Sequence, residues 1–132
     1  MPRQAVGAPG TLPDGSANPL STAVRAGDFV FVSGLMAKDA AGRMVEGDIT
    51  TQTEAIFIRL KAVLAGAGLG LDDVVKCTVW LTRAEDFAAF NAAYARQFAG
   101  PPPARSTVRA DLLLPGALIE LEAVCYRPVA PP

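Results

Sequence analysis

Histidine is absent from this 132-residue chain. Ser-His and Cys-His nucleophile systems, together with most zinc sites, need an imidazole and are therefore excluded. Cysteine is scarce, since the chain holds two. Cys77 and Cys125 both fall on apolar faces of predicted strands, where a free thiol packs as a small hydrophobic group. We expect both thiols to be reduced, and we expect no metal site.

The chain also lacks a long apolar run and an excess of positive charge. No apolar stretch approaches the ~18 residues that a membrane span needs, and the N-terminus does not have the charged and then apolar pattern of a signal peptide. The formal net charge is −1, and the 12 basic residues are scattered along the sequence. We therefore expect a cytoplasmic protein that binds neither a membrane nor nucleic acid.

Hydrophobic residues make up 51% of the chain, which at this length is enough to build the core of one compact domain. Residues 1–17 are rich in Pro, Gly, Ala and Ser and show no periodicity. This composition predicts an N-terminal loop that is ordered only where it docks on the domain. Residues 18–132 are predicted to form that single domain.

Apolar periodicity predicts two helices and five or six strands. Helical spacing extends over residues 51–65 and from Phe87 to Phe98, and a capping-box pattern begins at Thr51 and again at Thr82. The strand patterns lie at residues 20–25, 29–34, 43–45, 74–81, 105–109 and 119–125. The order of these elements predicts an α+β fold in which two helices cover one face of a mixed sheet.

The last two predicted strands carry the most informative polar residues. Arg105 and Thr107 lie on one face of the first strand by alternation. Glu120 and Glu122 lie on the polar face of the second strand, opposite its apolar face. A Pro-Gly pair between the two strands has turn chemistry, so we expect an antiparallel hairpin in which all four polar side chains share one face.

This polar cluster has two interpretations. The first is an ordinary solvated face on which opposite charges pair across strands, worth about 0.2–1 kcal/mol per pair. The second is a small anion site, in which the planar guanidinium of Arg105 binds a carboxylate while a glutamate handles a proton or a water molecule. Three prolines before Arg105 suit a rigid site, but they also suit the end of a helix. The pattern alone leaves both interpretations open.

The second face of the predicted sheet is also apolar. Strands 29–34 and 74–81 carry apolar side chains on both faces, whereas two helices cover one face. A second face left in water would expose a large apolar patch, so we expect the chain to self-associate.

Five motifs of the chain resemble the Rid family of reactive-intermediate (enamine/imine) deaminases, also called YjgF-like. They lie, in the family's order, at residues 18–34, 74–79, 86–94, 103–108 and 114–123, and the last two together are quite specific. The resemblance implies a chorismate-mutase-like α+β fold and a homotrimer with its sites in clefts between subunits. It also implies hydrolysis of a 2-imino (2-enamino) acid to a keto acid and ammonia, with no metal or organic cofactor.

The same resemblance implies roles for three residues of the polar cluster. Arg105 matches the family arginine that binds the substrate carboxylate. Glu120 matches the carboxylate that positions or activates the hydrolytic water. Thr107 stands where the best-studied members have cysteine, and it is expected to support one of these two groups.

Further positions of the implied site include two departures from the family pattern. Ser33 and Gly34 match the strand end whose backbone lines the cleft, and Asn91 matches an asparagine at the cleft edge. Leu20 stands where the family often has tyrosine, and Leu35 stands where it often has glutamine. Both departures make the pocket more apolar, which allows a bulkier or less polar substrate.

Two other functions remain open alongside deamination of a small imino acid. One is a non-catalytic member of the family that holds a carboxylate ligand for regulation. The other is a deaminase of a bulkier substrate of the 2-aminomuconate type. An endoribonuclease, a label sometimes attached to the family, fits poorly, because the chain has neither histidine nor a basic stripe.

Overall fold

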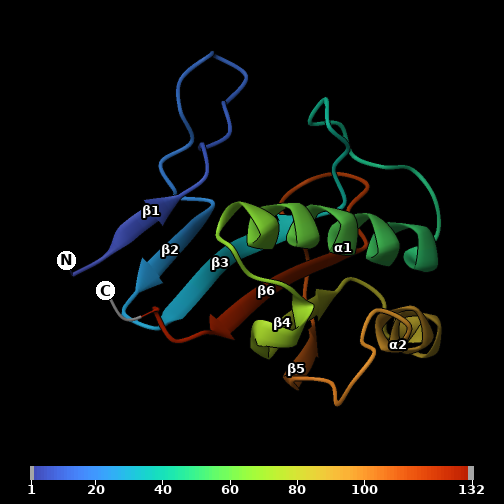
Figure 1. Cartoon of the computed structure of the whole chain (residues 1–132). Helices are drawn as coiled ribbons and strands as arrows, with labels where there is room; N and C mark the ends of the chain where they lie inside the picture. Colours follow the sequence, from blue (N-terminus) through green and yellow to red (C-terminus); the bar gives the residue numbers. More distant parts are fainter. Residues whose placement is uncertain (1, 131–132) are drawn as a thin grey trace.

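The computed structural model describes residues 2–130. Over these residues, six strands form one mixed sheet and two helices lie on one of its faces (Figure 1). The elements in chain order are β1 (Gln4–Val6), β2 (Ala23–Ala26), β3 (Phe29–Met36), α1 (Ile49–Gly66), β4 (Val74–Leu81), α2 (Phe87–Ala95), β5 (Ala104–Arg109) and β6 (Ile119–Tyr126). The predicted α+β fold is confirmed. Part of the N-terminal segment predicted as loop forms β1, because it docks on β2.

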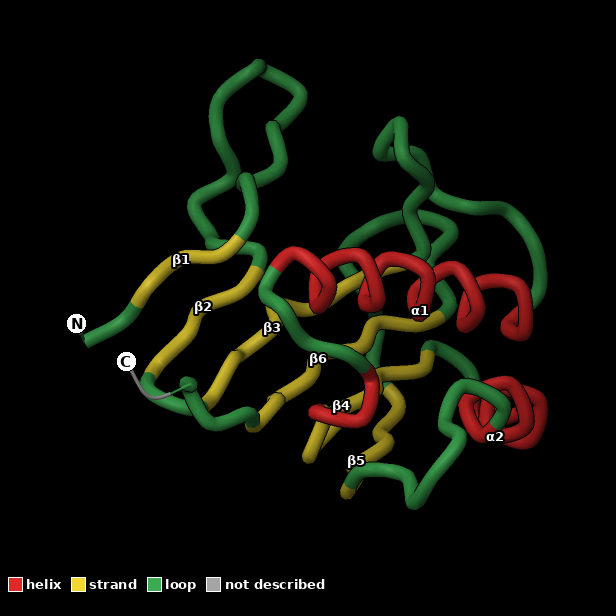
Figure 2. Tube along the Cα trace, in the orientation of Figure 1, coloured by secondary structure: helices red, strands yellow, loops and turns green. Residues whose placement is uncertain are grey.

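The strand order is β1-β2-β3-β6-β4-β5, with β4 and β5 parallel and the other neighbours antiparallel (Figure 2). The predicted hairpin of β5 and β6 is therefore wrong, because β4 lies between them. The residues explain the order. Every second side chain of β6 from Ile119 to Cys125 is buried, which suits a central strand, whereas β5 carries two arginines and suits an edge.

This strand order separates the polar cluster. Arg105 and Thr107 pair in register with Cys77 and Val79 of β4, whose side chains are buried beneath the helices. Glu120 pairs with Trp80 on the opposite, open face of the sheet, and Glu122 follows the same alternation. The prediction that these polar side chains share one face is wrong.

Helix α1 begins one turn earlier than the capping-box pattern predicts. The N-cap is Asp48, whose Oδ1 accepts a hydrogen bond from the backbone N–H of Thr51 at 2.9 Å. Its buried side turns Ile56, Phe57, Leu60 and Leu64 onto the sheet. None of the helices described over residues 2–130 is long and apolar enough to cross a bilayer.

A buried glutamine of α1 fixes the entry to β6. The Gln52 side chain donates to the carbonyls of Val45 (3.0 Å) and Gly116 (2.8 Å), and it accepts from the N–H of Leu118 (2.9 Å). All of its polar atoms are thus used although it is fully buried. The residues just before the strand that carries Glu120 are held in place from the helix layer.

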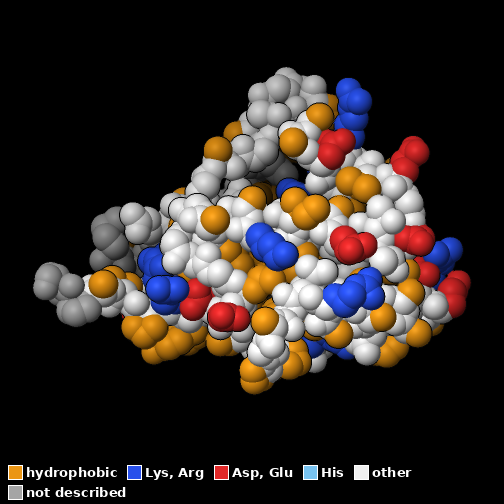
Figure 3. Space-filling model, turned by 45° about the vertical axis from the view of Figure 1, so that its right-hand side comes forward, with side chains coloured by type: hydrophobic (Ala, Val, Ile, Leu, Met, Phe, Trp, Pro, Cys, Tyr) orange, Lys and Arg blue, Asp and Glu red, His pale blue; other side chains and the backbone are white. Residues whose placement is uncertain are grey.

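The open face of the sheet is apolar over much of its area. Phe29 and Phe31 of β3, Tyr126 of β6 and Val108 of β5 are all partly exposed, and the ring of Phe29 packs against those of Phe31 and Tyr126. The space-filling view shows acidic and basic side chains interspersed over the side that it presents, with hydrophobic side chains along its lower rim (Figure 3). An uncovered apolar sheet face is the feature that favours self-association.

Candidate functional site

Arg105 lies against the aromatic side of α2. Its guanidinium carbon is 4.7 Å from the ring centroid of Tyr94, 5.1 Å from that of Phe90 and 5.9 Å from that of Phe87. The three rings belong to one face of α2 because they are spaced by three and four residues. A guanidinium stacks favourably on ring faces, which is the reason a charged side chain can lie beneath a helix here.

Within residues 2–130, Arg105 makes neither an ion pair nor a side-chain hydrogen bond. The salt bridges of this part of the chain join Arg83 to Asp86 and Arg127 to Asp73. Arg105 is half-buried, so its charge is partly removed from water without an anion to compensate it. Its planar set of N–H groups can donate hydrogen bonds to both oxygens of a carboxylate.

Two further polar groups around this point have no hydrogen-bond partner. Among the described side chains, the buried polar atoms without one are the Thr107 Oγ1 and the Tyr94 hydroxyl. Thr107 is two residues from Arg105 on the same face of β5, and the Tyr94 ring stacks on Arg105. Buried polar groups are normally satisfied, so this concentration makes the region a candidate binding site.

Cys77 lies beside Arg105 in the register of β4 and β5. Burial raises the pKa of its thiol, although the Arg105 charge acts in the opposite direction. Burial also raises the pKa of the Tyr94 hydroxyl, and the neighbouring Cys77 adds to this effect. Both groups are therefore neutral at physiological pH and neither is an activated nucleophile.

Glu120 lies on the other face of the sheet, over a bulge in β3. The register between β3 and β6 shifts between Val32 and Leu35, so that Ser33 and Gly34 together oppose one residue of β6. A Cβ atom at Gly34 would collide with the Oε2 of Glu120. Glycine is thus required for the carboxylate to lie directly against the backbone of the bulge.

The electrostatics of this second region suit a base. Burial raises the pKa of Glu120, and the like charge of Glu122 raises it further. Ser33 is occupied structurally, since its Oγ donates to the carbonyl of Ser21 at 2.5 Å. The backbone of Ser33 and Gly34 is what remains to line a cleft next to the carboxylate.

The remaining predicted site residues lie outside these two groups. Asn91 is exposed on α2, next in sequence to Phe90, and Leu20 is 48% exposed in the segment before β2. A single chain thus brings Arg105 together with Thr107, and Glu120 together with the bulge. It does not bring the two groups together.

The sequence analysis did not identify the three rings around Arg105 as part of the site. The spacing of Phe87, Phe90 and Tyr94 predicts an apolar stripe, which is the usual signature of core packing. Two of the rings are indeed core, because Phe90 and Tyr94 are buried. The signal that could have found them is the connection between the parallel strands β4 and β5. Parallel neighbours need a crossover, and α2 is this crossover helix, which packs on the sheet beside the strand that follows it.

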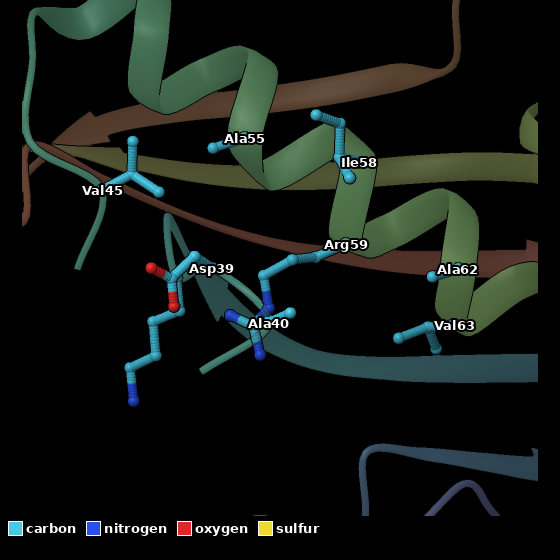
Figure 4. A pocket seen from close by; sticks show the side chains of 9 residues that line it. Asp39, Ala40, Val45, Ala55, Ile58, Arg59, Ala62 and Val63 are labelled. Carbon is cyan, nitrogen blue, oxygen red and sulfur yellow. The ribbon is translucent and has the colours of Figure 1, made fainter. Parts of the chain in front are cut away.

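A groove of about 520 Å³ lies elsewhere, along the outer side of α1 (Figure 4). Its lining is mainly apolar and comprises Lys38, Asp39, Ala40, Val45, Ala55, Ile58, Arg59, Ala62 and Val63. Arg59 reaches across it and donates to the carbonyl of Met36 at 2.6 Å, and burial lowers the pKa of this guanidinium. None of the predicted site residues contributes to the groove.

Comparison with known proteins decides the family. The family profile described as Endoribonuclease L-PSP, which covers the YjgF, RidA and RutC proteins, matches residues 13–127. The chain belongs to this family. A RutC family protein of Pyrococcus horikoshii is 42% identical over 110 residues, covering 83% of this chain and 87% of that protein.

Solved structures of the Rid family share its fold. RidA from an Antarctic Psychrobacter is 33% identical, with a TM-score of 0.83 over 94% of this chain and 99% of that one. E. coli TdcF, solved with bound serine, is 29% identical, with a TM-score of 0.83 over 94% of this chain and 98% of that one. The resemblance found in the motifs is thus confirmed at the level of the family and of the fold.

Proposed function

We propose that this Rid-family chain is a homotrimeric deaminase that hydrolyses a 2-imino acid to a 2-keto acid and ammonia. The observation that carries the proposal is the unpaired guanidinium of Arg105, held on ring faces with its N–H donors unused. The serine bound to E. coli TdcF is a small molecule with a carboxylate, and it supports a ligand of this class. A keto acid and its parent imine both present the carboxylate that Arg105 would bind.

The proposal places each site between two chains. Arg105 and Glu120 lie on opposite faces of one sheet, and so one small substrate cannot contact both in the same chain. Arg105 belongs to the edge strand β5, where a neighbouring copy can approach with its open face and its Glu120. Closing three copies into a ring completes three identical sites and also covers the apolar open faces.

The chemistry makes modest demands on such a site. Arg105 holds the carboxylate through two parallel N–H···O bonds and thereby places the adjacent C=N carbon near Glu120 of the neighbouring chain. Glu120 takes a proton from water as the oxygen attacks this carbon, forming a carbinolamine. This proton is delivered to the imine nitrogen, which becomes the amine of the carbinolamine. The carbinolamine hydroxyl then gives up its own proton, which Glu120 transfers to the same nitrogen as the C=O bond forms, the C–N bond breaks, and ammonia leaves. Thr107 donates a hydrogen bond to the carboxylate or the water, and no metal or organic cofactor is needed.

Two variants test this assignment in an assay that generates the imine from an amino acid in situ and measures ammonia. Arg105→Lys should raise KM strongly, because an ammonium cannot reproduce the two-pronged contact. Glu120→Gln should still bind the keto acid while kcat falls. If both Arg105→Lys and Arg105→Ala keep near wild-type deamination, the site lies elsewhere.

Mixing the two impaired variants tests whether the site is shared between chains. When Arg105→Lys and Glu120→Gln chains are unfolded, mixed in equal amounts and reassembled, about a quarter of the sites should combine an intact Arg105 with an intact Glu120. Recovery of about that share of wild-type activity supports shared sites. No recovery, in trimers shown by mass spectrometry to be mixed, contradicts them.

A non-catalytic carboxylate binder is the second candidate function. Leu20 and Thr107 favour it, because they replace the tyrosine and cysteine expected from the family pattern and leave the arginine in place. Such a protein would bind a keto acid with the affinity that Arg105 confers and would not accelerate ammonia release. The apolar side chain of Leu20, which stands where the family often has tyrosine, also suits a deaminase of a bulkier imino acid. In that case the bulkier imino acid should be turned over faster than a small one.

A further inference from the structure

The rings of Phe87, Phe90 and Tyr94 differ in how deeply they are buried. Phe90 and Tyr94 are part of the core, whereas Phe87 is 45% exposed. The Phe87 ring packs on Phe90 at 6.4 Å between centroids and lies 5.9 Å from the Arg105 guanidinium carbon. Phe87 is thus not part of the core cluster, and its ring contacts both the charged group and the neighbouring ring of Phe90.

The three rings constrain the guanidinium in a way that suits ligand binding. A ring face interacts with the flat face of a guanidinium and leaves the in-plane N–H donors free. Arg105 has no anion or hydrogen-bond acceptor among residues 2–130 to hold it otherwise. Without the rings, the long side chain would lose its single orientation, and a ligand would have to restrict its rotamers on binding.

We propose that Phe87, Phe90 and Tyr94 are positioning residues that fix the plane of the Arg105 guanidinium and thereby set the affinity of the site for carboxylates. Phe87 is the outermost of the three and controls how far the guanidinium can swing toward solvent. The inference rests on the proposed function for its ligand, but the geometry of the rings and Arg105 can be tested without any ligand. The rings act through Arg105 and take no part in the chemical step.

Phe87→Leu is the decisive variant, because the position is partly exposed and tolerates a smaller apolar side chain without loss of the core. The dissociation constant for 2-oxobutanoate, measured by calorimetry, should rise about 2- to 5-fold, the effect expected of one cation–π contact at an accessible site. KM for the imine should rise by a similar factor while kcat stays within a factor of about two. Phe87→Trp, which keeps a ring face, should restore wild-type affinity.

Phe98→Leu is the matched control. Phe98 belongs to the same aromatic cluster, with its ring 5.1 Å from that of Tyr94 and 5.7 Å from that of Phe57, but it is not among the rings that contact Arg105. The same substitution there should leave the dissociation constant unchanged. Equal weakening in both variants, or none in Phe87→Leu, overturns the inference.

A spectroscopic measurement separates this inference from the proposed function. The Arg105 Nε–H resonance, assigned by its absence in Arg105→Lys, should show a ring-current shift in the free protein that becomes smaller in Phe87→Leu and not in Phe98→Leu. If this pattern is seen but no imine is hydrolysed, the positioning role stands and the deaminase proposal fails. If Phe87→Leu leaves the resonance unmoved, the positioning role is wrong whatever the activity.

Discussion

Replacing Phe31 with threonine should dissociate the proposed trimer while leaving the chain folded. Phe31 lies on the open face of β3, and its side chain is 46% exposed in the single chain. An aromatic side chain presents roughly 200 Å² of surface, so about 90 Å² of Phe31 is left for a neighbouring subunit to cover. Threonine has the β-branched shape that a strand favours and removes most of this apolar area.

The expected effect on assembly is large. At about 25 cal/mol per Å², the exposed part of Phe31 contributes about 2 kcal/mol per chain and about 7 kcal/mol per trimer, or about five powers of ten in the trimer dissociation constant. Sedimentation velocity over a range of concentrations measures this quantity directly. Thermal stability is the wrong readout, since the buried half of the ring also stabilises the monomer.

Ile58→Thr provides the control for this experiment. Ile58 is 70% exposed on the outer side of α1, away from the open sheet face, and its replacement also removes apolar area while keeping a β-branched side chain. It should leave the dissociation constant unchanged. A wild-type chain that is monomeric at micromolar concentration, or a Phe31→Thr chain that dissociates no more than Ile58→Thr, would refute the assembly argument.

Three further predictions concern the two halves of the site. Burial and the charge of Glu122 raise the pKa of Glu120 in the folded chain. The folded chain therefore loses stability as the pH rises from the ordinary glutamate pKa of about 4.3 through the raised pKa. Glu120→Gln should melt at a higher temperature than wild type at pH 7 and show no such advantage at pH 4. Gly34→Ala should change the free energy of unfolding by less than about 1 kcal/mol, since the flexible end of Glu120 can move away, but kcat should fall because the carboxylate is displaced; unchanged kcat would argue against Glu120 as the base. Thr107→Val removes a buried hydroxyl without a partner and should raise the unfolding free energy in urea by about 1 kcal/mol while weakening substrate binding a few-fold; a loss of stability would mean that the hydroxyl is bonded in the assembled protein.

The sequence predicted the helices and strands better than it predicted which strands pair with each other in the sheet. Alternation correctly separated the buried and exposed residues within β6, because the side-chain period of a strand is a local property. It could not place Arg105 relative to Glu120, because that depends on which strands pair. The Pro-Gly turn favoured a hairpin with β5, whereas β6 in fact lies between β3 and β4.

The surroundings of the candidate site also depend on tertiary contacts that a local sequence pattern does not predict. Strand alternation made Arg105 and a glutamate candidates, the family resemblance implied roles for Arg105 and Glu120, and the structure adds what surrounds each of them. The aromatic rings around Arg105 and the bulge beneath Glu120 arise from contacts between residues distant in sequence. The start of α1 also differs from the prediction, because Asp48 and not Thr51 is the N-cap, and the backbone N–H of Thr51 donates to the Asp48 side chain.

The placement of Arg105 and Glu120 on opposite faces of the sheet has an evolutionary consequence. The group proposed to bind the substrate is supported by α2, and the group proposed to activate water is supported by the bulge of β3. Substitutions in one support leave the other in place, so substrate preference can diverge while the hydrolytic half stays constant. In the proposed site, the hydroxyl of Thr107 is then a change beside the binding group Arg105 that a lineage can accumulate without rebuilding the support of Glu120.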